Sequence, residues 1–213
     1  MQLMSCQTTA PKAPERYDLQ NINGYVRYMA QSRTLHAELT FKSDSTQKIA
    51  GDVLLNNQSM QFKKLPVVGF QYRQDVDRVN FVNQYTFSYL EKDGSKQEWS
   101  IGLEKFQSLT VASDGISQTK GGLLAWEGEP LKDQNDALML LFTDSEGSTF
   151  QINHAGITKG KQFEIKDIHA NRLALGKATL LVTRKRTVVE QGTPNKIGQI
   201  EYYLPAISFE VKE

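Results

Sequence analysis

The sequence predicts an all-β fold made of two consecutive antiparallel β-sandwich domains. Segments 34–41 and 79–89 alternate apolar and polar residues with the period of two that is expected of a half-buried strand. Turn-forming residues recur at the spacing of about 8 to 12 residues that is typical of sandwiches and barrels. No segment longer than about ten residues carries a convincing apolar stripe with the helical period of 3.6.

In the first half, short apolar segments separated by turns predict a series of strands. The expected strands are 25–29, 34–41, 49–55, 61–64, 67–72, 79–89, 99–103 and 106–111. The strongest alternation is in 79–89, where Tyr85, Phe87 and Tyr89 share one face. Asp93-Gly94 lies at the centre of a hairpin loop, and Trp99 and Ile101 supply the apolar face of the returning strand.

In the second half, segment 121–153 is expected to form the core. Leu123–Trp126 and Ala137–Thr143 are apolar strands, the second of them buried on both faces, and Thr149–Asn153 returns after a turn. Further strands are expected at 163–165, 178–187, 200–204 and 207–211. The polar segment Ala112–Lys120 has no apolar periodicity and is interpreted as a linker. This gives a tether over 1–16, one sandwich over 17–112 and a second over 113–213.

Composition excludes several classes of function. The chain has 213 residues and a formal net charge of +1, so no large field of one sign favours nucleic acid. No apolar run approaches the roughly 20 residues that span a bilayer. With Cys6 as its only cysteine, the chain forms no intrachain disulfide and no zinc site that needs two or four cysteines. We expect no cofactor and no metal.

The N-terminal segment Leu3-Met4-Ser5-Cys6 resembles the lipobox of bacterial lipoproteins. The polar, proline-containing residues 7–14 that follow are similar to the tether of a mature lipoprotein. The resemblance implies lipid attachment at Cys6 and a location in the bacterial cell envelope. Only five residues precede Cys6, so it also implies a signal segment upstream of Met1. The implied partners are the membrane, through the anchor, and envelope proteins or surface glycans, without nucleic acid.

A second resemblance concerns Leu173–Arg184, which reads LALGKATLLVTR. This segment resembles the late hairpin of immunoglobulin-like domains in bacterial surface proteins. Together with Gly121–Asn153 and the closing strand Ile207–Val211, it implies an immunoglobulin-like domain over residues 113–213.

Several polar groups are candidate metal ligands. His36 and Glu38 lie two apart on the polar face of one strand and could reach one metal or one substrate, although exposed strand residues are the commoner case. A three-histidine metal site with His154 and His169 is a weaker alternative, since the three are distant in sequence. Segment 133–136 (DQND) has oxygens suited to calcium but lacks the remaining ligands of a calcium loop, so we interpret it as a solvated loop.

Other motifs have structural interpretations. Gly156–Lys161 departs from the phosphate-loop spacing and is interpreted as a hairpin loop. Arg184 and Arg186 share a strand face that could bind a carboxylate or phosphate, but a solvated edge strand protected by charge is favoured. Trp99 and Trp126 lie within apolar patterns, which favours core packing over sugar binding.

The leading hypothesis for function is a non-enzymatic, lipid-anchored envelope protein with a binding or scaffolding role. The first alternative is a carbohydrate- or peptide-binding module of a surface complex. It requires an exposed patch formed by some of Tyr72, Tyr85, Trp99, Tyr202 and Tyr203. The second alternative is a hydrolase with a site at the domain junction. It requires Asp75, Asp77, His154 and His169 to gather in one pocket.

Overall fold

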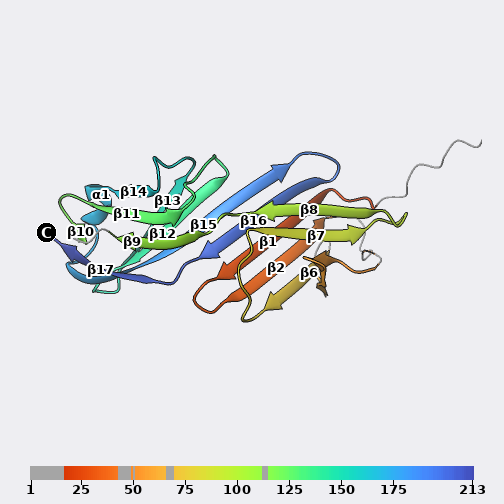
Figure 1. Ribbon diagram of the computed structural model, residues 1–213, viewed down its shortest axis with the longest axis horizontal. Coiled ribbons are helices and arrows are strands. Elements are labelled where there is room, and N and C mark those ends of the chain that lie inside the picture. The colour runs from red at the N-terminus through yellow and green to blue at the C-terminus, as the bar shows by residue number, and fades with distance from the viewer. Residues whose placement is uncertain (1–16, 43–48, 50, 66–69, 112–114) are drawn as a thin grey trace, which may run out of the picture.

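The protein is an elongated, nearly all-β molecule in a computed structural model that describes residues 17–42, 49, 51–65, 70–111 and 115–213 (Figure 1). Within these ranges, the strands form three sheets of ten, three and four strands. The one helix among the described residues is α1 (Asp167–Ala170), a single turn. The predicted all-β class is confirmed, with most strand pairs antiparallel. The lipobox residues and the predicted tether lie outside the described ranges.

The ten-stranded sheet is the largest of the three. Its main path runs in the order β10–β17–β15–β16–β1–β2–β6–β5, and β12 and β13 continue from the other edge of β15. The bounds are β1 Asn21–Met29, β2 Thr34–Lys42, β5 Gln61–Lys64, β6 Phe70–Val76, β10 Ile116–Ser117, β12 Asp136–Thr143, β13 Thr149–Ala155, β15 Gly176–Glu190, β16 Asn195–Tyr203 and β17 Ile207–Lys212. Two pairs, β1–β16 and β10–β17, are parallel, which the antiparallel prediction did not include.

A four-stranded sheet covers the first half of the large sheet. It consists of β3 (Leu54–Leu55), β4 (Gln58–Ser59), β7 (Gln84–Leu90) and β8 (Lys96–Gly102), with β7 and β8 joined by the predicted hairpin. The strand predicted over 79–89 begins only at Gln84. That predicted over 49–55 is reduced to its last two residues. Side chains outside the shortened strands are still buried, although their backbone is not paired in a sheet. Ile49 and Val53, for example, are both 1% exposed.

Two glycines fix how closely the sheets of this half approach. Gly24 of β1 and Gly198 of β16 are register partners, so they form one notch across neighbouring strands. The indole of Trp99 on β8 fills this notch together with Ile101, whose Cγ2 would lie 2.3 Å from a methyl group added at Gly198. A methyl group added at Gly24 would lie 2.5 Å from the indole Cζ3, and one added at Gly198 would lie 2.9 Å from the indole Cζ2. Both glycines are therefore needed for close packing rather than for backbone freedom.

The second half is also a pair of facing sheets. A small sheet with the order β14–β11–β9 comprises β9 (Phe106–Val111), β11 (Gly122–Gly128) and β14 (Gln162–Ile165). It lies over β12, β13, β15 and β17 in Figure 1. The core of this half includes Leu124 and Trp126 of β11, and Leu138, Leu140 and Phe142 of β12, all buried. The intervening β12 residues are half-buried, so the expectation of full burial on both faces is wrong for that strand.

The predicted division at residues 112 and 113 does not coincide with the division of the sheets. Strands β9 and β11, on either side of the supposed linker, pair with each other, and part of that linker forms β10. Strand β16 returns to pair with β1. The 15-residue strand β15 spans about 50 Å at 3.3 Å per residue and belongs to both halves. Its start pairs with β17 and its end with β16.

The turn between β12 and β13 is held by Asp144, and this gives a pH prediction. One carboxylate oxygen accepts the N–H groups of Glu146 and Ser148 at 3.0 and 2.9 Å, and the other accepts that of Ala174 at 3.1 Å. The bond from Ala174 and those from the turn hold the pKa of Asp144 below its ordinary value. Because the folded pKa lies below the unfolded one, this stabilisation is complete above the ordinary carboxyl range and is lost as the pH falls below about 4.

We therefore expect the urea midpoint of the native chain to fall more steeply between pH 6 and pH 3 than that of Asp144→Asn. The variant should be less stable at neutral pH, because its amide has one acceptor oxygen where the carboxylate has two. Glu146→Gln, which removes an exposed carboxyl of the same turn, is the control and should keep the native slope. Parallel pH profiles for Asp144→Asn and the native chain would contradict the assignment.

Candidate functional site

In the first half of the molecule, the face of the large sheet that points away from the four-stranded sheet carries a hydrogen-bonded network of aromatic and charged side chains. Glu201 of β16 is 8% exposed and is the centre of this network. One of its oxygens accepts the hydroxyls of Tyr25 at 2.7 Å and Tyr203 at 2.9 Å, and the other accepts the Gln199 amide at 2.7 Å. The Arg27 guanidinium donates to the Tyr25 hydroxyl at 2.7 Å.

The strand pattern explains why these groups meet. Within β1, Val26 and Tyr28 point toward the four-stranded sheet and are buried, so Tyr25 and Arg27 point outward. The parallel register places Arg27 opposite Glu201. Burial, together with the bond to Glu201, raises the pKa of Tyr25 and of Tyr203. Both hydroxyls therefore stay protonated at neutral pH and keep donating to the carboxylate.

His36 extends the same face across β2 and β6. Its Nδ1 lies 2.7 Å from the Asp75 carboxylate, and its Nε2 lies 3.0 Å from that of Glu38. The sequence placed His36 and Glu38 on one strand face and favoured two exposed residues; the structure instead has them half-buried and paired with each other. Asp75 is a third member, and its pKa is lowered first by the bond from Arg73 and then by that from His36. The Tyr25 and His36 rings lie edge to face at 6.1 Å, which joins the two clusters.

We name Tyr25, Arg27, His36, Glu38, Glu201 and Tyr203 the open-face cluster. Its tyrosine rings are half-buried, with their hydroxyls already bonded, and the guanidinium is exposed. Aromatic rings and arginine held in fixed positions are the side chains that contribute most at protein interfaces. This arrangement is suited to binding a partner. Tyr25, Arg27 and Glu201 were missed from the sequence, because only the parallel pairing of β1 with β16 brings them together.

The junction of the two halves holds a separate network of buried charges. Arg184 of β15 is 2% exposed and donates to the backbone carbonyls of Glu129 at 2.9 Å and Pro130 at 3.1 Å. Its guanidinium also lies over the Phe106 ring, 4.8 Å from the centroid. Burial lowers the pKa of Arg184, and the negative charge of Asp136 acts in the opposite direction. The interpretation of this segment as a solvated edge strand is wrong, because β15 is paired along both edges.

Arg184, Arg186, Asp133 and Asp136 form one ion-pair network, which we call the junction network. Arg186 binds Asp136 at 3.0 Å and Asp133 at 2.8 Å, while Arg184 lies 3.8 Å from Asp136. The sequence analysis considered carboxylate binding by these arginines as the less favoured alternative, and in the structure the carboxylates that they meet belong to the chain itself. The solvated loop expected at 133–136 is found at Gln134 and Asn135, which are exposed, whereas the carboxylates of Asp133 and Asp136 bind Arg186.

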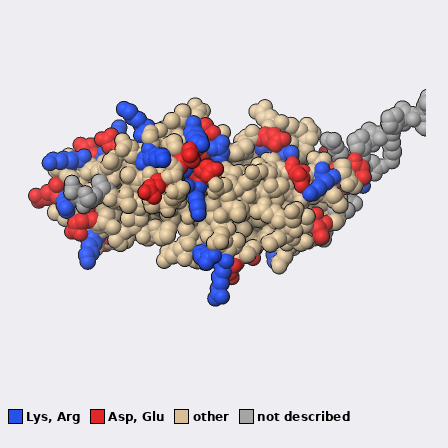
Figure 2. Space-filling model, viewed as in Figure 1, with Lys and Arg blue, Asp and Glu red and all other residues tan. Residues whose placement is uncertain are grey.

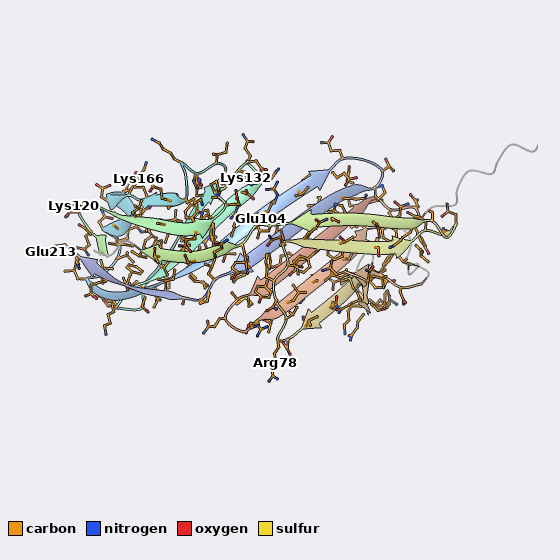
Figure 3. The ribbon with its side chains drawn as sticks, viewed as in Figure 1. Arg78, Glu104, Lys120, Lys132, Lys166 and Glu213 are labelled. Atoms are coloured by element: carbon orange, nitrogen blue, oxygen red, sulfur yellow. The ribbon has the colours of Figure 1, made fainter. Side chains whose placement is uncertain are left out.

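A pocket of about 410 Å³ lies beside this network. Its lining includes Glu104 and Lys132, which lie near the middle of the molecule in Figure 3. Figure 2 shows acidic and basic side chains side by side in the same region. The residues that the hydrolase alternative needs are elsewhere: Asp75 and Asp77 are at the end of β6, and His154 and His169 line a different pocket.

The aromatic candidates are mostly interior. Trp99 and Trp126 are 8% and 5% exposed, so the prediction of core packing is confirmed for both. Of the five residues required by the carbohydrate alternative, Tyr72, Tyr85, Trp99 and Tyr202 are buried and only Tyr203 is half-buried. These five residues therefore form no flat exposed patch.

The remaining candidates also have defined places. His36 lies in the first half, away from the pocket that His154 and His169 line, so the three histidines do not converge. Gly156–Lys161 connects β13 to β14, which belong to different sheets, so it is not the hairpin loop that was expected.

In the described ranges, no three His, Cys, Asp or Glu side chains are grouped to hold a metal. No helix in the described part of the chain is long and apolar enough to cross a bilayer.

Comparisons with known proteins show no family. No protein-family model and no curated protein matches the chain. Among solved structures, it is similar to one described as a tetra-tandem repeat in the extending region of a large adhesion protein, with 11% sequence identity and a TM-score of 0.30. The match covers 89% of this chain and 49% of that one, so the chain spans about half the length of the structure it matches.

Proposed function

We propose that the chain is a non-enzymatic binding or scaffolding protein of the bacterial cell envelope, anchored to the membrane by lipid on Cys6. The observation that carries this proposal is the placement of the chain ends. The backbone N–H of Tyr17, the first described residue, donates to Glu91 at 3.0 Å beside the β7–β8 hairpin, and this hairpin lies at the opposite end of the elongated molecule from Glu213 (Figures 1 and 3). An anchor upstream of Tyr17 would leave the rest of the molecule projecting from the membrane.

Stiffness supports a projecting role. Strand β15 belongs to both halves, and the junction network fixes it to the β11–β12 connection through Arg184. The halves are thus joined by continuous sheet rather than by a flexible linker. In this proposal, the two facing sheets of the half that contains the C-terminus form an immunoglobulin-like unit, which includes β9 and so begins before the predicted boundary at residue 113. The open-face cluster is the surface that meets an envelope partner.

The anchor is tested by the mass of the N-terminal peptide. We expect the native gene, expressed in a bacterial host with its upstream DNA, to give a chain that begins at Cys6 and carries a diacylglyceryl-sized addition. The protein should fractionate with membranes, because an anchor of more than one acyl chain gives stable attachment. Cys6→Ser is the matched control and should remove both the added mass and the membrane association. An unmodified chain that begins at Met1 would refute the anchor.

A further inference from the structure

In the half that contains the C-terminus, the large sheet ends at β13, which has a partner strand on one side only. Among the described residues, β13 pairs with β12 and with no other strand. At one end of this pair, the Asp144 N–H donates to the Ser148 carbonyl at 3.0 Å. At the other end, the Gly156 N–H donates to the Asp136 carbonyl at 2.9 Å.

These two bonds show which backbone groups of β13 face its free edge. Hydrogen-bonded residues alternate along an antiparallel pair, so the even-numbered residues of β13 bond to β12. The N–H and C=O groups of the odd-numbered residues point the other way, toward the free edge. These residues are Thr149, Gln151, Asn153 and Ala155, and their side chains are all exposed. A further strand would find both donors and acceptors there.

The free edge of β13 lacks the usual protection against such a strand. Natural edge strands are shortened, bulged or supplied with charges or proline. The seven residues of β13 read TFQINHA, without Lys, Arg, Asp, Glu or Pro. The other edges among the described strands differ. Strand β8 carries Lys96 and Glu98, the pairing of β9 shifts register between Glu127 and Gly128, and β5 and β14 are four-residue strands with charges. Strand β13 is therefore the edge best suited to accept another strand.

The sequence of β13 is also complementary to itself in antiparallel orientation. With a two-fold axis at Ile152, the β13 strands of two copies would pair over their whole length. Gln151 would face Asn153 of the other copy, and both belong to the residues whose backbone groups point to the free edge. No like charges would meet, because β13 carries none.

Two exposed isoleucines lie on the same side of the molecule. Ile157 follows β13 and is 69% exposed, and Ile168 of α1 is 64% exposed, which makes them the most exposed large apolar side chains in the described ranges. Helix α1 is close to β13, because His169 and Asn153 line one pocket. A two-fold axis between antiparallel strands is perpendicular to the sheet, so the small sheets and α1 helices of both copies would lie on one face. The isoleucines would then border the new contact and lose exposure to water.

We propose that two copies of the chain associate through β13, antiparallel about Ile152, and so join their ten-stranded sheets into one. A second copy is the occupant that the self-complementary, uncharged strand favours. The contact consists of a single strand pair with an apolar border, so the dimer is weak and depends on concentration. This inference goes beyond the envelope role. It depends neither on the lipid anchor nor on the open-face cluster, which lies in the other half of the molecule.

The test is sedimentation velocity of the 213-residue chain, expressed from Met1 and kept in reducing buffer so that Cys6 cannot link two copies. Concentrations run from about 1 µM to about 1 mM, the range of weak association. We expect the weight-average mass to rise from 24.1 kDa toward twice that value. A monomer at every concentration would overturn the inference.

Charges at Gln151 and Asn153 locate the contact and its register. Gln151→Lys/Asn153→Lys would place lysine opposite lysine across the two-fold axis and should weaken the dimer by about tenfold or more. Gln151→Lys/Asn153→Glu would place each lysine opposite a glutamate, provided that the axis is at Ile152, and should dimerise at least as tightly as the native chain. Ser59→Lys/Gln61→Lys is the matched control, since it adds two lysines at exposed strand positions in the other half.

The variants are expected to keep the native unfolding temperature, because both β13 side chains are exposed. Dimerisation of Gln151→Lys/Asn153→Lys with native affinity would place the contact on another surface and overturn the inference. So would an equal loss of affinity in the control, which would reflect net charge alone. A Lys/Glu variant as weak as the Lys/Lys variant would overturn the antiparallel register about Ile152.

Discussion

Replacing Asp136 with alanine is expected to lower the free energy of unfolding by about 3–5 kcal/mol, the usual cost of breaking a buried ion pair by removing one partner. Asp136 is 1% exposed, and both of its oxygens are engaged. One accepts from Arg186 at 3.0 Å, and the other accepts the backbone N–H of Lys132 at 3.0 Å. Its removal would leave Arg184 buried with only carbonyl and ring contacts.

The matched control is Asp133→Ala. Asp133 also binds Arg186, at 2.8 Å, but its side chain is 41% exposed. Exposed ion pairs contribute only about 0–1 kcal/mol, so this variant should lose little stability. Urea unfolding of the two variants measures the difference directly. If both variants lost the same free energy of unfolding, burial would not determine the strength of the junction network. Asp136 would then not be the residue that stabilises the buried Arg184.

The second large effect is expected at the notch beneath Trp99. Trp99→Ala should cost about 3–5 kcal/mol, since it removes a large buried side chain from between two sheets. Gly24→Ala should cost about 1–3 kcal/mol, because the added methyl group would lie 2.5 Å from the indole and force the sheets apart. Both values are measured by urea unfolding.

A double variant distinguishes overpacking from any other effect of alanine at Gly24. In a Trp99→Leu background the indole is absent and only Phe87 Cε2, at 3.0 Å, stays close to the added methyl group, so Gly24→Ala should cost less than in the native chain. Gly192→Ala is the control, because its nearest neighbour would be an ordinary contact at 3.6 Å. An unchanged cost of Gly24→Ala in the Trp99→Leu background would show that the notch does not determine the spacing of the sheets.

Strand existence was predicted well because it depends on local alternation. Segments 34–41, 61–64 and 106–111 are strands with nearly the expected bounds. The errors arose where apolar residues enter the core without a ladder partner, as at Ile49 and Val53. An alternating pattern reports which side chains face the core, but it does not report whether the backbone is paired.

The candidate site shows the same limit. His36 and Glu38 were found because they are two residues apart on one strand, a local relation. Glu201 joins the open-face cluster only through the pairing of β1 with β16, and Asp75 reaches His36 only through the pairing of β2 with β6. Arg184 was assigned to an exposed edge for the same reason, since a charged residue gives no local sign that a distant carboxylate accompanies it into the core.

The sequence by itself determined the all-β class, the positions of most strands and turns, and many of the residues that fill the core, because these depend on periodicity and turn chemistry within a few residues. Only the tertiary structure decided that β15 serves both halves, that β16 returns beside β1, and that Arg184 lies buried beside Asp136. Each of these is a contact between segments far apart along the chain. Its free energy comes from burying both partners at once, and that information is absent from either segment alone.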